Sequence, residues 1–376
     1  MTPSLRAFTA YFLALGALGF GGPIALIGAM QRDLVERRRW ISREDYLQGL
    51  ALAQLAPGPL AAQLAIYLGW VRARIAGATL VGIAFILPSF VMVVALSALY
   101  MRLGGLPWMR SVFYGVAPAA IAIVARGAFK LARMTLARDV PLWIAFGASA
   151  VATALSGREW ILLVLACGLM VMAARRRGTG ATALLGLVPA GAWVTGLHGP
   201  AKSGTLIQLG AYFAAAGTFV FGSGLAIVPF LHGGVVGGHH WLDERQFLDA
   251  VAVAMITPGP VVITVAFIGY LVAGLAGAGV AAAGVFLPCY LLVVGPAPHF
   301  RRAAAIGPLR DFVQGVTAAA TGAIAGSVWV LARRAVVDLP SALIGAAALA
   351  LVFTVRRIPE PVLILFAAFA GLLVRR

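Results

Sequence analysis

The triplet Pro-Gly-Pro occurs twice in this chain, as Pro57-Gly58-Pro59 and as Pro258-Gly259-Pro260, each time inside a long apolar run. Proline lacks the amide donor that a helix needs and collides with the preceding turn, so no straight helix continues through the triplet. A helix must therefore end before each triplet, and a new helix must begin after it. Proline at the first helical position favours such a restart.

A helix that restarts inside an apolar run presents unpaired amide groups. In the first copy these groups belong to Leu60, Ala61 and Ala62, and they carry the positive end of the helix dipole. Helix N-termini of this kind bind anions. In lipid they are tolerated only where they face protein or a water-filled cavity. The sequence thus predicts an anion site at the breaks, in a shared polar chamber at mid-depth.

The composition places the chain in a membrane. It is 62% hydrophobic and 11% charged over 376 residues, whereas soluble domains carry about a quarter of charged residues. We therefore expect an all-α polytopic membrane protein. The net charge of +17 comes from short basic groups between apolar segments, which set orientation and meet anionic lipid, so membrane lipid and not nucleic acid is the expected partner. Cys167 and Cys289 lie in apolar stretches without metal spacing, and no metal or cofactor is expected.

An internal repeat covers the chain. Matched segments keep an offset of 201 residues up to the second triplet, and after a one-residue gap they keep an offset of 200. Such a register identifies a tandem duplication. The matched pairs are Phe20-Gly21 with Phe221-Gly222, Trp40 with Trp241, the two triplets, Tyr67-Leu68-Gly69-Trp70 with Phe267-Ile268-Gly269-Tyr270, Leu87-Pro88-Ser89-Phe90 with Leu287-Pro288-Cys289-Tyr290, and Leu131-Ala132-Arg133 with Leu331-Ala332-Arg333.

We divide the chain into a first repeat at 1–178, a linker at 179–202 with an extra apolar segment, and a second repeat at 203–376. Each repeat begins with an apolar segment that a glycine-rich break interrupts, followed by a polar stretch, 31–43 or 232–243. Capping residues then start the next helix, Ser42 with Asp45 and Asp243 with Gln246. Long apolar spans follow at 74–103 and 110–134, and at 276–298 and 312–336, and two shorter spans close each half, within 138–174 and within 339–374.

The basic residues of corresponding loops suggest opposite orientations for the two repeats. The polar stretch at 31–43 carries five arginines, whereas its counterpart at 232–243 and the following turn carry only Arg245. The loop at 299–310 reverses this bias. Cytoplasmic loops are enriched in Lys and Arg, and inverted repeats with interrupted helices are common in secondary transporters. We predict inverted repeats; parallel repeats stay open because the later loops are basic in both halves.

Four stretches together resemble the chromate ion transporter family, in its long-chain, two-domain form. They are Phe20-Gly21-Gly22-Pro23, Leu34-Val35-Glu36-Arg37-Arg38-Arg39-Trp40, Ala53-Gln54-Leu55-Ala56-Pro57-Gly58-Pro59 and Ala65-Ile66-Tyr67-Leu68-Gly69. The resemblance implies a multi-pass protein of the bacterial inner membrane that exports chromate, driven by the proton gradient. The second copy departs from the pattern, with Ser223, Gly224 and Met255 in place of Gly22, Pro23 and Gln54. Because of these changes, the resemblance does not imply that both halves contact the substrate equally.

The predicted substrate site suits a tetrahedral dianion, because backbone amides and neutral side-chain donors replace water around its oxygens. The competing interpretations are simple helix bends and close glycine packing. The candidate residues are Gly21, Gly22, Gln54, Pro57, Gly58, Pro59, Gln63 and Arg126 in the first half and Gly222, Ser223, Thr257, Pro258, Gly259, Pro260 and Thr264 in the second.

Charged residues inside apolar segments are functional candidates by default. Arg126 is the deepest cation of its segment and a candidate oxyanion partner, whereas Lys130 and Arg133 are expected to reach the interface. Asp249 is the candidate for carrying a coupled proton, and Gln48 is its counterpart in the first half. We interpret His232, His239 and His240 as polar loop residues, and Glu44, Asp45 and Glu244 as charges favourable to a helix start.

Three classes of function compete. The first is a secondary transporter of chromate, or of sulfate or another oxyanion. A passive anion channel shares the fold signals but needs a continuous polar lining, whereas the polar residues here gather at the breaks. A membrane-embedded enzyme needs paired acids, a metal-binding helix or a nucleophile with its base, and the sequence has none of these. It also lacks a nucleotide-binding loop. A homodimer is left open.

Overall fold

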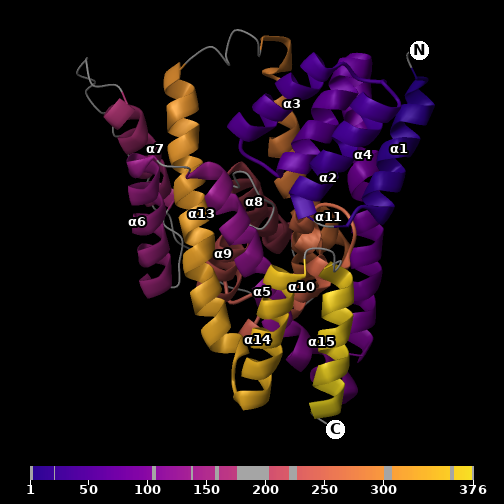
Figure 1. Ribbon diagram of the computed structural model, residues 1–376. Coiled ribbons are helices and arrows are strands. Elements are labelled where there is room, and N and C mark those ends of the chain that lie inside the picture. Colours follow the sequence, from indigo (N-terminus) through magenta and orange to yellow (C-terminus); the bar gives the residue numbers. More distant parts are fainter. Residues whose placement is uncertain are drawn as a thin grey trace.

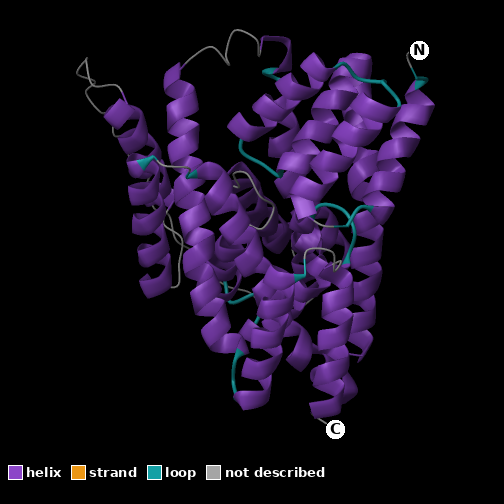
Figure 2. Cartoon of the chain, viewed as in Figure 1, coloured by secondary structure: helices purple, strands orange, loops and turns teal. Residues whose placement is uncertain are grey.

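The computed structural model describes residues 3–20, 22–103, 107–136, 139–156, 161–175, 203–219, 227–299, 307–355 and 360–374. Within these ranges every regular element is a helix and no strand is found (Figures 1 and 2). The prediction of an all-α membrane protein is confirmed. The extra apolar segment expected in the linker lies outside the described residues.

Each half begins with a helical hairpin. In the first half, α1 (Leu5–Leu18) is followed by α2 (Gly22–Met30) and a π-helix, η1 (Gln31–Arg37). The Tyr11 hydroxyl donates to Asp33 Oδ2 at 3.5 Å, and the ring centroids of Phe8 and Trp40 are 6.2 Å apart. Residues this distant in sequence would be at least about 33 Å apart in one straight helix. The chain therefore turns back after Leu18, where the glycine-rich break was predicted.

The second half repeats this hairpin with α8 (Ser203–Phe219), α9 (Ile227–Leu231) and a second π-helix, η3 (His232–Gly238). The Tyr212 hydroxyl donates to the Phe230 carbonyl at 2.9 Å, and the two rings stack. The segments 31–43 and 232–243, expected as polar stretches, thus begin with π-helical turns. Such turns are rare in proteins, and those that occur are frequently at functional sites.

A second hairpin follows in each half, and the Pro-Gly-Pro triplet is at its tip. The helix α3 (Arg43–Leu55) ends directly before the triplet, and α4 (Leu60–Leu103) begins after it. Leu64 would lie 3.1 Å from a β-carbon at Gly49, and the ring of Tyr67 would collide with it. The two helices therefore fold back on each other, so the predicted stop and restart is confirmed, but the restarted helix reverses direction.

The element α4 is itself two helices. Ala73 (φ −151°, ψ 37°) and Arg74 (φ 51°, ψ −137°) leave the helical region, and the chain reverses there. Gly69 packs on the carbonyl of Gly77 across this turn. In the second half, α10 (Glu244–Ile256) leads through a 3₁₀ turn, η4 (Val261–Ile263), into α11 (Thr264–Val294), which reverses in the same way at 273–274.

The lengths of the helices predict that the two tips end inside the membrane. The 13 residues of α3 and the segment 60–72 each measure about 20 Å, too short for a hydrocarbon core of about 30 Å. The segment 75–103 measures about 43 Å and is long enough to cross it. By length and composition, four described stretches are candidate spans, with shorter apolar helices beside them: Leu60–Arg102, Ser111–Arg133, Val261–Val294 and Asp311–Ala335. The first and the third of these contain the reversals.

The last three helices of each half interlock with the other half. These are α5 (Pro107–Thr135), α6 (Val140–Ser156) and α7 (Ile161–Arg175) in the first half, and α13 (Gly307–Ala335), α14 (Leu339–Thr354) and α15 (Glu360–Val374) in the second. The pair α6 and α7 packs on α13, whereas α14 and α15 pack on α5 (Figure 1). Glycines allow close backbone contact here, as at Gly315 against Gly168 and Gly115 against Gly371. Neither half is therefore an independent packing unit. A short 3₁₀ turn, η5 (Ala297–His299), follows α11.

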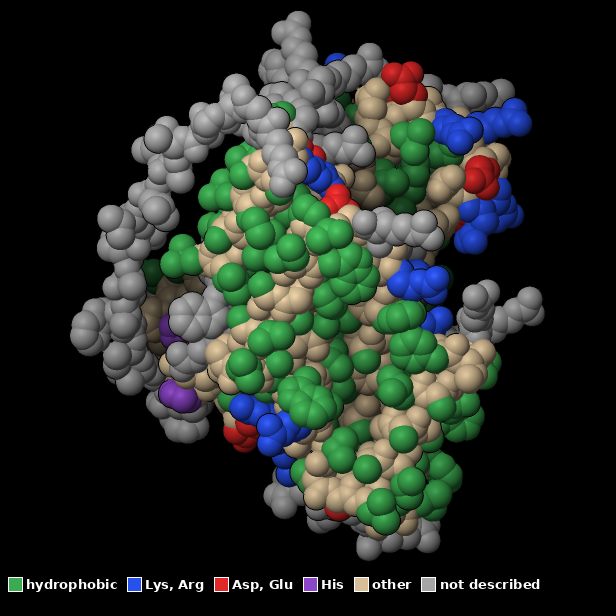
Figure 3. All heavy atoms as spheres, turned by 60° about the vertical axis from the view of Figure 1, so that its left-hand side comes forward, with side chains coloured by type: hydrophobic (Ala, Val, Ile, Leu, Met, Phe, Trp, Pro, Cys, Tyr) green, Lys and Arg blue, Asp and Glu red, His purple; other side chains and the backbone are tan. Residues whose placement is uncertain are grey.

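The outer surface is apolar. Along 75–103, the exposed side chains Ile75, Leu80, Ile83, Leu87 and Val91 recur every three to five residues and form one stripe. Apolar side chains cover most of the face in Figure 3, and Lys and Arg side chains lie toward its margins. This surface is suited to contact with lipid, as the composition predicted.

Candidate functional site

The first break is stabilised by the side chain of Gln63. Gly58 has φ +134°, a conformation that favours glycine, and the chain there leaves the carbonyls of Ala56 and Pro57 without helical partners. The Nε2 group of Gln63 donates to both carbonyls, at 3.1 Å and 2.7 Å. The side-chain amide therefore satisfies backbone groups that the break exposes. Both side-chain N–H groups are used in this way, so they are not free to donate to a bound anion.

The amides at the helix start remain as the donors of the first break. The backbone amide of Gln63 donates to the Pro59 carbonyl at 3.0 Å and makes the first hydrogen bond of the helix. For the amides of Leu60, Ala61 and Ala62, the described residues provide no acceptor outside the helix. These three groups are buried and directed at the break, as the sequence predicted.

One acceptor at the first break is also unpaired. The side chain of Gln63 is fully buried, and its Oε1 atom has no hydrogen-bond partner among the described residues. A buried polar atom without a partner costs about 1–3 kcal/mol. The first break therefore combines unpaired donors with an unpaired acceptor.

At the second break, the polar groups form hydrogen bonds within their own turns. Ile263 donates to the Pro260 carbonyl at 2.9 Å in the 3₁₀ turn η4, and this turn coincides with the one-residue gap between the repeats. The hydroxyls of Thr257 and Thr264 donate to the carbonyls of Val253 and Val261, both at 2.7 Å. These hydroxyls were predicted as substrate donors. Their protons are used within their own turns instead, as polar side chains in apolar surroundings commonly do.

The breaks of the two halves meet each other's helices. The Gly259 amide donates to the Gly19 carbonyl at 2.8 Å, which joins the second triplet to the end of α1. Gly259 also packs on Ser89, and Gly58 packs on Cys289, whose Sγ lies 3.1 Å from a β-carbon placed at Gly58. Ser89 and Cys289 occupy equivalent positions of the repeat, so each triplet lies against the same helix of the opposite half.

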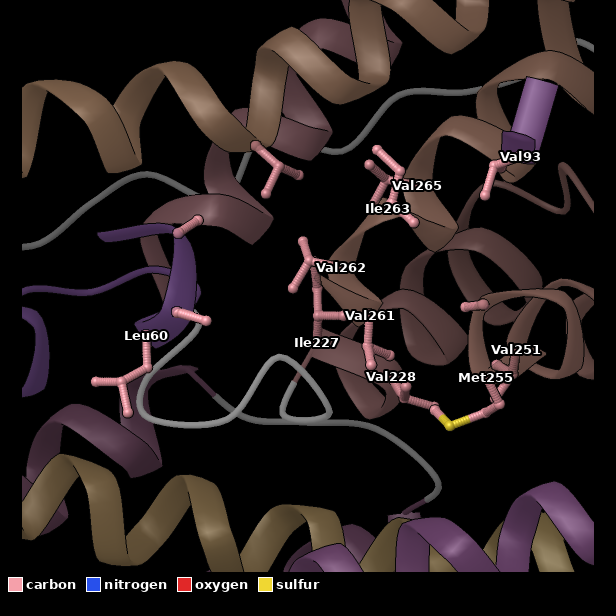
Figure 4. Packing of buried hydrophobic residues seen from close by; sticks show 14 of the residues in the cluster. Leu60, Val93, Ile227, Val228, Val251, Met255, Val261, Val262, Ile263 and Val265 are labelled. Atoms are coloured by element: carbon pink, nitrogen blue, oxygen red, sulfur yellow. The ribbon is translucent and has the colours of Figure 1, made fainter. Parts of the chain in front are cut away.

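The immediate surroundings of the breaks are apolar in this conformation. Leu60 and the segment 261–263 belong to one hydrophobic cluster that also contains Ile227 and Val228 of α9 (Figure 4). Pro59, Pro258 and Pro260 are buried and Pro57 is half-buried. The polar groups at the breaks are thus backbone amides and a few buried side chains.

Several predicted site residues lie elsewhere. Gln54 is exposed on α3, and Arg126 is half-buried on α5 without an ion pair to any described residue. Lys130 and Arg133 are exposed, in keeping with their predicted position at the interface. Gly22 begins α2. Gly21, Gly222 and Ser223 lie outside the described residues.

Asp249, the candidate proton carrier, is deeply buried. It is 2% exposed and accepts a 2.7 Å hydrogen bond from the Tyr100 hydroxyl near the end of α4. The Tyr100 ring contacts Phe267 at 5.3 Å between centroids. This tyrosine therefore connects the acid of α10 to the helix that follows the second break. Sequence reasoning missed Tyr100, because nothing along the chain indicates that it meets a residue 149 positions later.

The interpretation of His232 as a polar loop residue is wrong. The residue is 5% exposed, and its Nε2 lies 2.9 Å from Glu244 Oε2 and 3.2 Å from Arg334 Nη1. Arg334 also pairs directly with Glu244. His239 stacks on Trp241 with ring centroids 4.2 Å apart. Among the described residues no group of three metal-ligating side chains comes together.

Duplicated re-entrant hairpins, with buried helix ends that meet across two interlocked halves, define a multi-pass membrane protein of the transporter class. The chain belongs to the chromate transporter family, whose model matches residues 6–172 and 207–372.

Full-length relatives support this membership. The chain is 55% identical to the chromate transport protein of Cupriavidus metallidurans, over 99% of this chain and 93% of the relative. It is 52% identical to the probable chromate transport protein of Synechococcus elongatus, over 98% and 95%, and 32% identical to the chromate transport protein of Pseudomonas aeruginosa, over 97% and 91%. No solved structure matches the chain. The chain is accordingly a multi-pass bacterial membrane protein.

Proposed function

We propose that this protein is a secondary transporter that exports chromate across the inner membrane in exchange for protons. The names of its full-length relatives support chromate as the substrate. The unpaired amides of the first break provide donors for the oxygens of a small anion. Sulfate or another tetrahedral oxyanion is the alternative substrate, because charge and shape are shared.

The observation that carries the proposal is the hydrogen bond from the Gly259 amide to the Gly19 carbonyl. It couples the tip of one hairpin in the second half to the tip of another in the first half. Buried, irregular backbone at such a junction is typical of the midplane binding sites of secondary transporters. A movement of one half against the other would change both breaks together.

Proton coupling is assigned to Asp249. An isolated carboxylate in apolar surroundings is costly unless it is protonated or paired. Asp249 has the Tyr100 hydroxyl as its partner, and Arg245 lies one turn earlier on the same helix. A group that gains and loses a proton between two conformations would link proton entry to anion exit.

An inverted arrangement of the halves fits the interlocked packing. In Figure 1, α14 and α15 lie at the bottom of the view, whereas α6 and α7, which occupy the same place in the repeat, lie toward the upper left. Equivalent helices at opposite ends of the molecule are expected from inverted repeats, which permit alternating access.

Transport into everted membrane vesicles tests the proposal. Vesicles that contain the protein should accumulate radiolabelled chromate when their interior is acidic, and a protonophore should reduce this accumulation to the level of empty vesicles. Excess sulfate should compete weakly if chromate is the substrate. Uptake that is indifferent to the gradient but saturable would contradict antiport, and uptake that does not saturate would favour a passive anion channel.

A further inference from the structure

We infer that the first break binds an oxyanion that still carries one proton, so that the transported species is hydrogenchromate and not the chromate dianion. Because this proton leaves with the anion, at least two protons must enter for each anion exported if the pH gradient drives the exchange. This inference rests on the proposed function and names the chemical form of the substrate. It follows from the orientation of one side chain, Gln63, and from what surrounds its free oxygen.

The orientation of Gln63 is fixed by its partners. Its Nε2 group donates to the carbonyls of Ala56 and Pro57. A flipped amide would place Oε1 against the same two carbonyl oxygens, leaving acceptors facing acceptors. The side chain therefore presents an acceptor, and not a donor, to anything bound at the break.

The free Oε1 atom requires a donor. It belongs to a fully buried side chain and has no partner among the described residues. The unpaired amides of Leu60 and Ala61 lie at the start of the same helix and require acceptors. A ligand that satisfies both must accept several hydrogen bonds and donate one. A monoprotonated oxyanion does so, with its anionic oxygens on the amides and its hydroxyl on Gln63.

The same geometry rejects a fully ionised dianion. Such an anion would place an unprotonated oxygen against Oε1, and two acceptors without a proton between them repel. Sites with a buried polar group that the wrong ligand leaves unpaired discriminate strongly. Chromate keeps its last proton to near-neutral pH, whereas sulfate and selenate lose theirs in strong acid. A requirement for the proton therefore separates anions of otherwise equal shape.

Among the residues that the structure describes, few titratable groups face this break. The Cys289 thiol faces it from α11, and Tyr67 lies one turn beyond Gln63 on the same helix. On α3, Glu44 is in the first turn, at the end of the helix opposite to the break, and accepts a hydrogen bond from Gln48. A pH dependence that originates in the substrate must be separated from any that originates in these groups or in Asp249.

Equilibrium binding to the purified full-length protein, without a gradient, makes this separation. The dissociation constant of radiolabelled chromate is measured between pH 6 and pH 8, with selenate as a tetrahedral dianion that has no proton to lose in this range. Above the pH at which chromate loses its last proton, the constant for total chromate should rise about tenfold per pH unit, in proportion to the loss of the protonated species. Selenate should bind at least about tenfold more weakly at pH 6, with a smaller pH dependence that reports the protein alone.

A variant sharpens the result. In Gln63→Met the acceptor is removed, so the preference for chromate over selenate at pH 6 should fall by about tenfold or more. Gln31→Met is the matched control, because Gln31 is exposed on η1 and bonds only to Glu36 among the described residues. Asp249→Asn should leave the difference between the two anions unchanged.

Each outcome of these measurements supports or contradicts the inference. Chromate and selenate that bind with the same pH-independent constant would overturn the inference, and water would then occupy the Gln63 oxygen, while saturable chromate transport would still support the proposed function. If wild-type protein neither binds nor transports chromate at any pH, the proposed function fails, and the inference fails with it. The comparison of the two anions on the wild-type protein needs no variant to fold.

Discussion

The two Pro-Gly-Pro breaks have the same backbone plan but differ in the groups that they leave free. The first restarts directly as an α-helix, and Gln63 satisfies the exposed carbonyls while keeping one oxygen unpaired. The second restarts through a 3₁₀ turn, and its threonine hydroxyls are bonded within their own turns. Duplication preserved the steric requirement for a break, whereas the polar side chains around it diverged.

The difference extends to ionisable groups. Asp249 lies two turns before the second break, buried against Tyr100, and its counterpart Gln48 bonds to Glu44. Among the described residues, the break with an unpaired side-chain oxygen is thus in the first half, and the buried acid Asp249 is in the second. We therefore propose that anion binding is centred on the first half and proton exchange on the second.

The sharpest test of this comparison replaces the two triplet glycines. In Gly259→Ala the new β-carbon overlaps the Ser89 hydroxyl, and in Gly58→Ala it lies 2.8 Å from Gln63 Nε2. Both positions have positive φ, which costs alanine about 1–2 kcal/mol. We expect both variants to lose nearly all vesicle transport, and Gly259→Ala also to lower the level of folded protein, because it disturbs the bond between the halves.

Two further variants control this prediction. Gly279→Ala, on α11, has open space around the added carbon and should transport normally. Ser89→Ala should partly restore Gly259→Ala but not Gly58→Ala, since a β-carbon at Gly259 meets the Ser89 hydroxyl, whereas a β-carbon at Gly58 meets Gln63 and Cys289. Normal transport by Gly259→Ala would reduce the breaks to simple bends.

The second prediction concerns the buried acid. In Asp249→Asn the exchangeable proton is lost, so chromate accumulation driven by the pH gradient should fall at least about tenfold, while movement of chromate down its own gradient persists. Tyr100→Phe keeps the acid and removes its hydrogen-bond donor, and it should have a smaller effect. The measurement is the initial rate in everted vesicles with and without a pH gradient.

The equivalent position of the first half provides the control. Gln48→Asn removes no ionisable group, so its gradient-driven rate should stay near that of the wild type. An Asp249→Asn variant that still responds fully to the gradient would assign coupling to another residue and remove the division of work between the halves.

The smallest expected effect comes from the base of the first hairpin. In the first half Arg38 lies over the Trp40 ring, 4.6 Å from its centroid, and in the second half His239 stacks on Trp241 at the equivalent place. Burial lowers the pKa of His239 below its ordinary value of 6.5. The unfolded chain then binds this proton more readily than the folded protein, so stability is lost as the pH falls below about 6.5.

Thermal unfolding in detergent checks this prediction. The wild type should unfold at a lower temperature at pH 5.5 than at pH 7.5, and His239→Phe should reduce that difference by a few degrees. Arg38→Gln should weaken the first half equally at both pH values, because it removes a cation–π contact and leaves His239 in place. An unchanged acid sensitivity in His239→Phe would assign it to another group.

Much of the fold was predictable because its signals are local. Proline and glycine forbid a continuous helix wherever they occur, so the ends of α3 and α10 follow from the triplets alone. Capping is equally local: Ser42 accepts from the Asp45 amide, and Asp243 forms a full capping box with Gln246. The repeat register even located the gap that the 3₁₀ turn η4 explains.

The reversals inside α4 and α11 were not predictable to the same degree. Gly274 permits the turn of the second half, but the first half makes it at Arg74, which carries no sequence signal for positive φ. What holds Arg74 there is the packing of Gly69 on Gly77 across the turn. The hydrophobic run is long enough for two helices, but its sequence does not indicate that they form a hairpin.

The sequence by itself determined that this chain is a duplicated, all-helical membrane protein with two helix breaks, because sterics, capping and apolar patterning act over a few residues. The tertiary structure alone decided which groups those breaks leave free. Gln63 presents an acceptor because its two N–H groups donate to nearby carbonyls. His232 contacts Arg334, which is 102 residues away in the sequence. Such outcomes depend on which distant segments pack together, and a one-dimensional pattern does not contain that information.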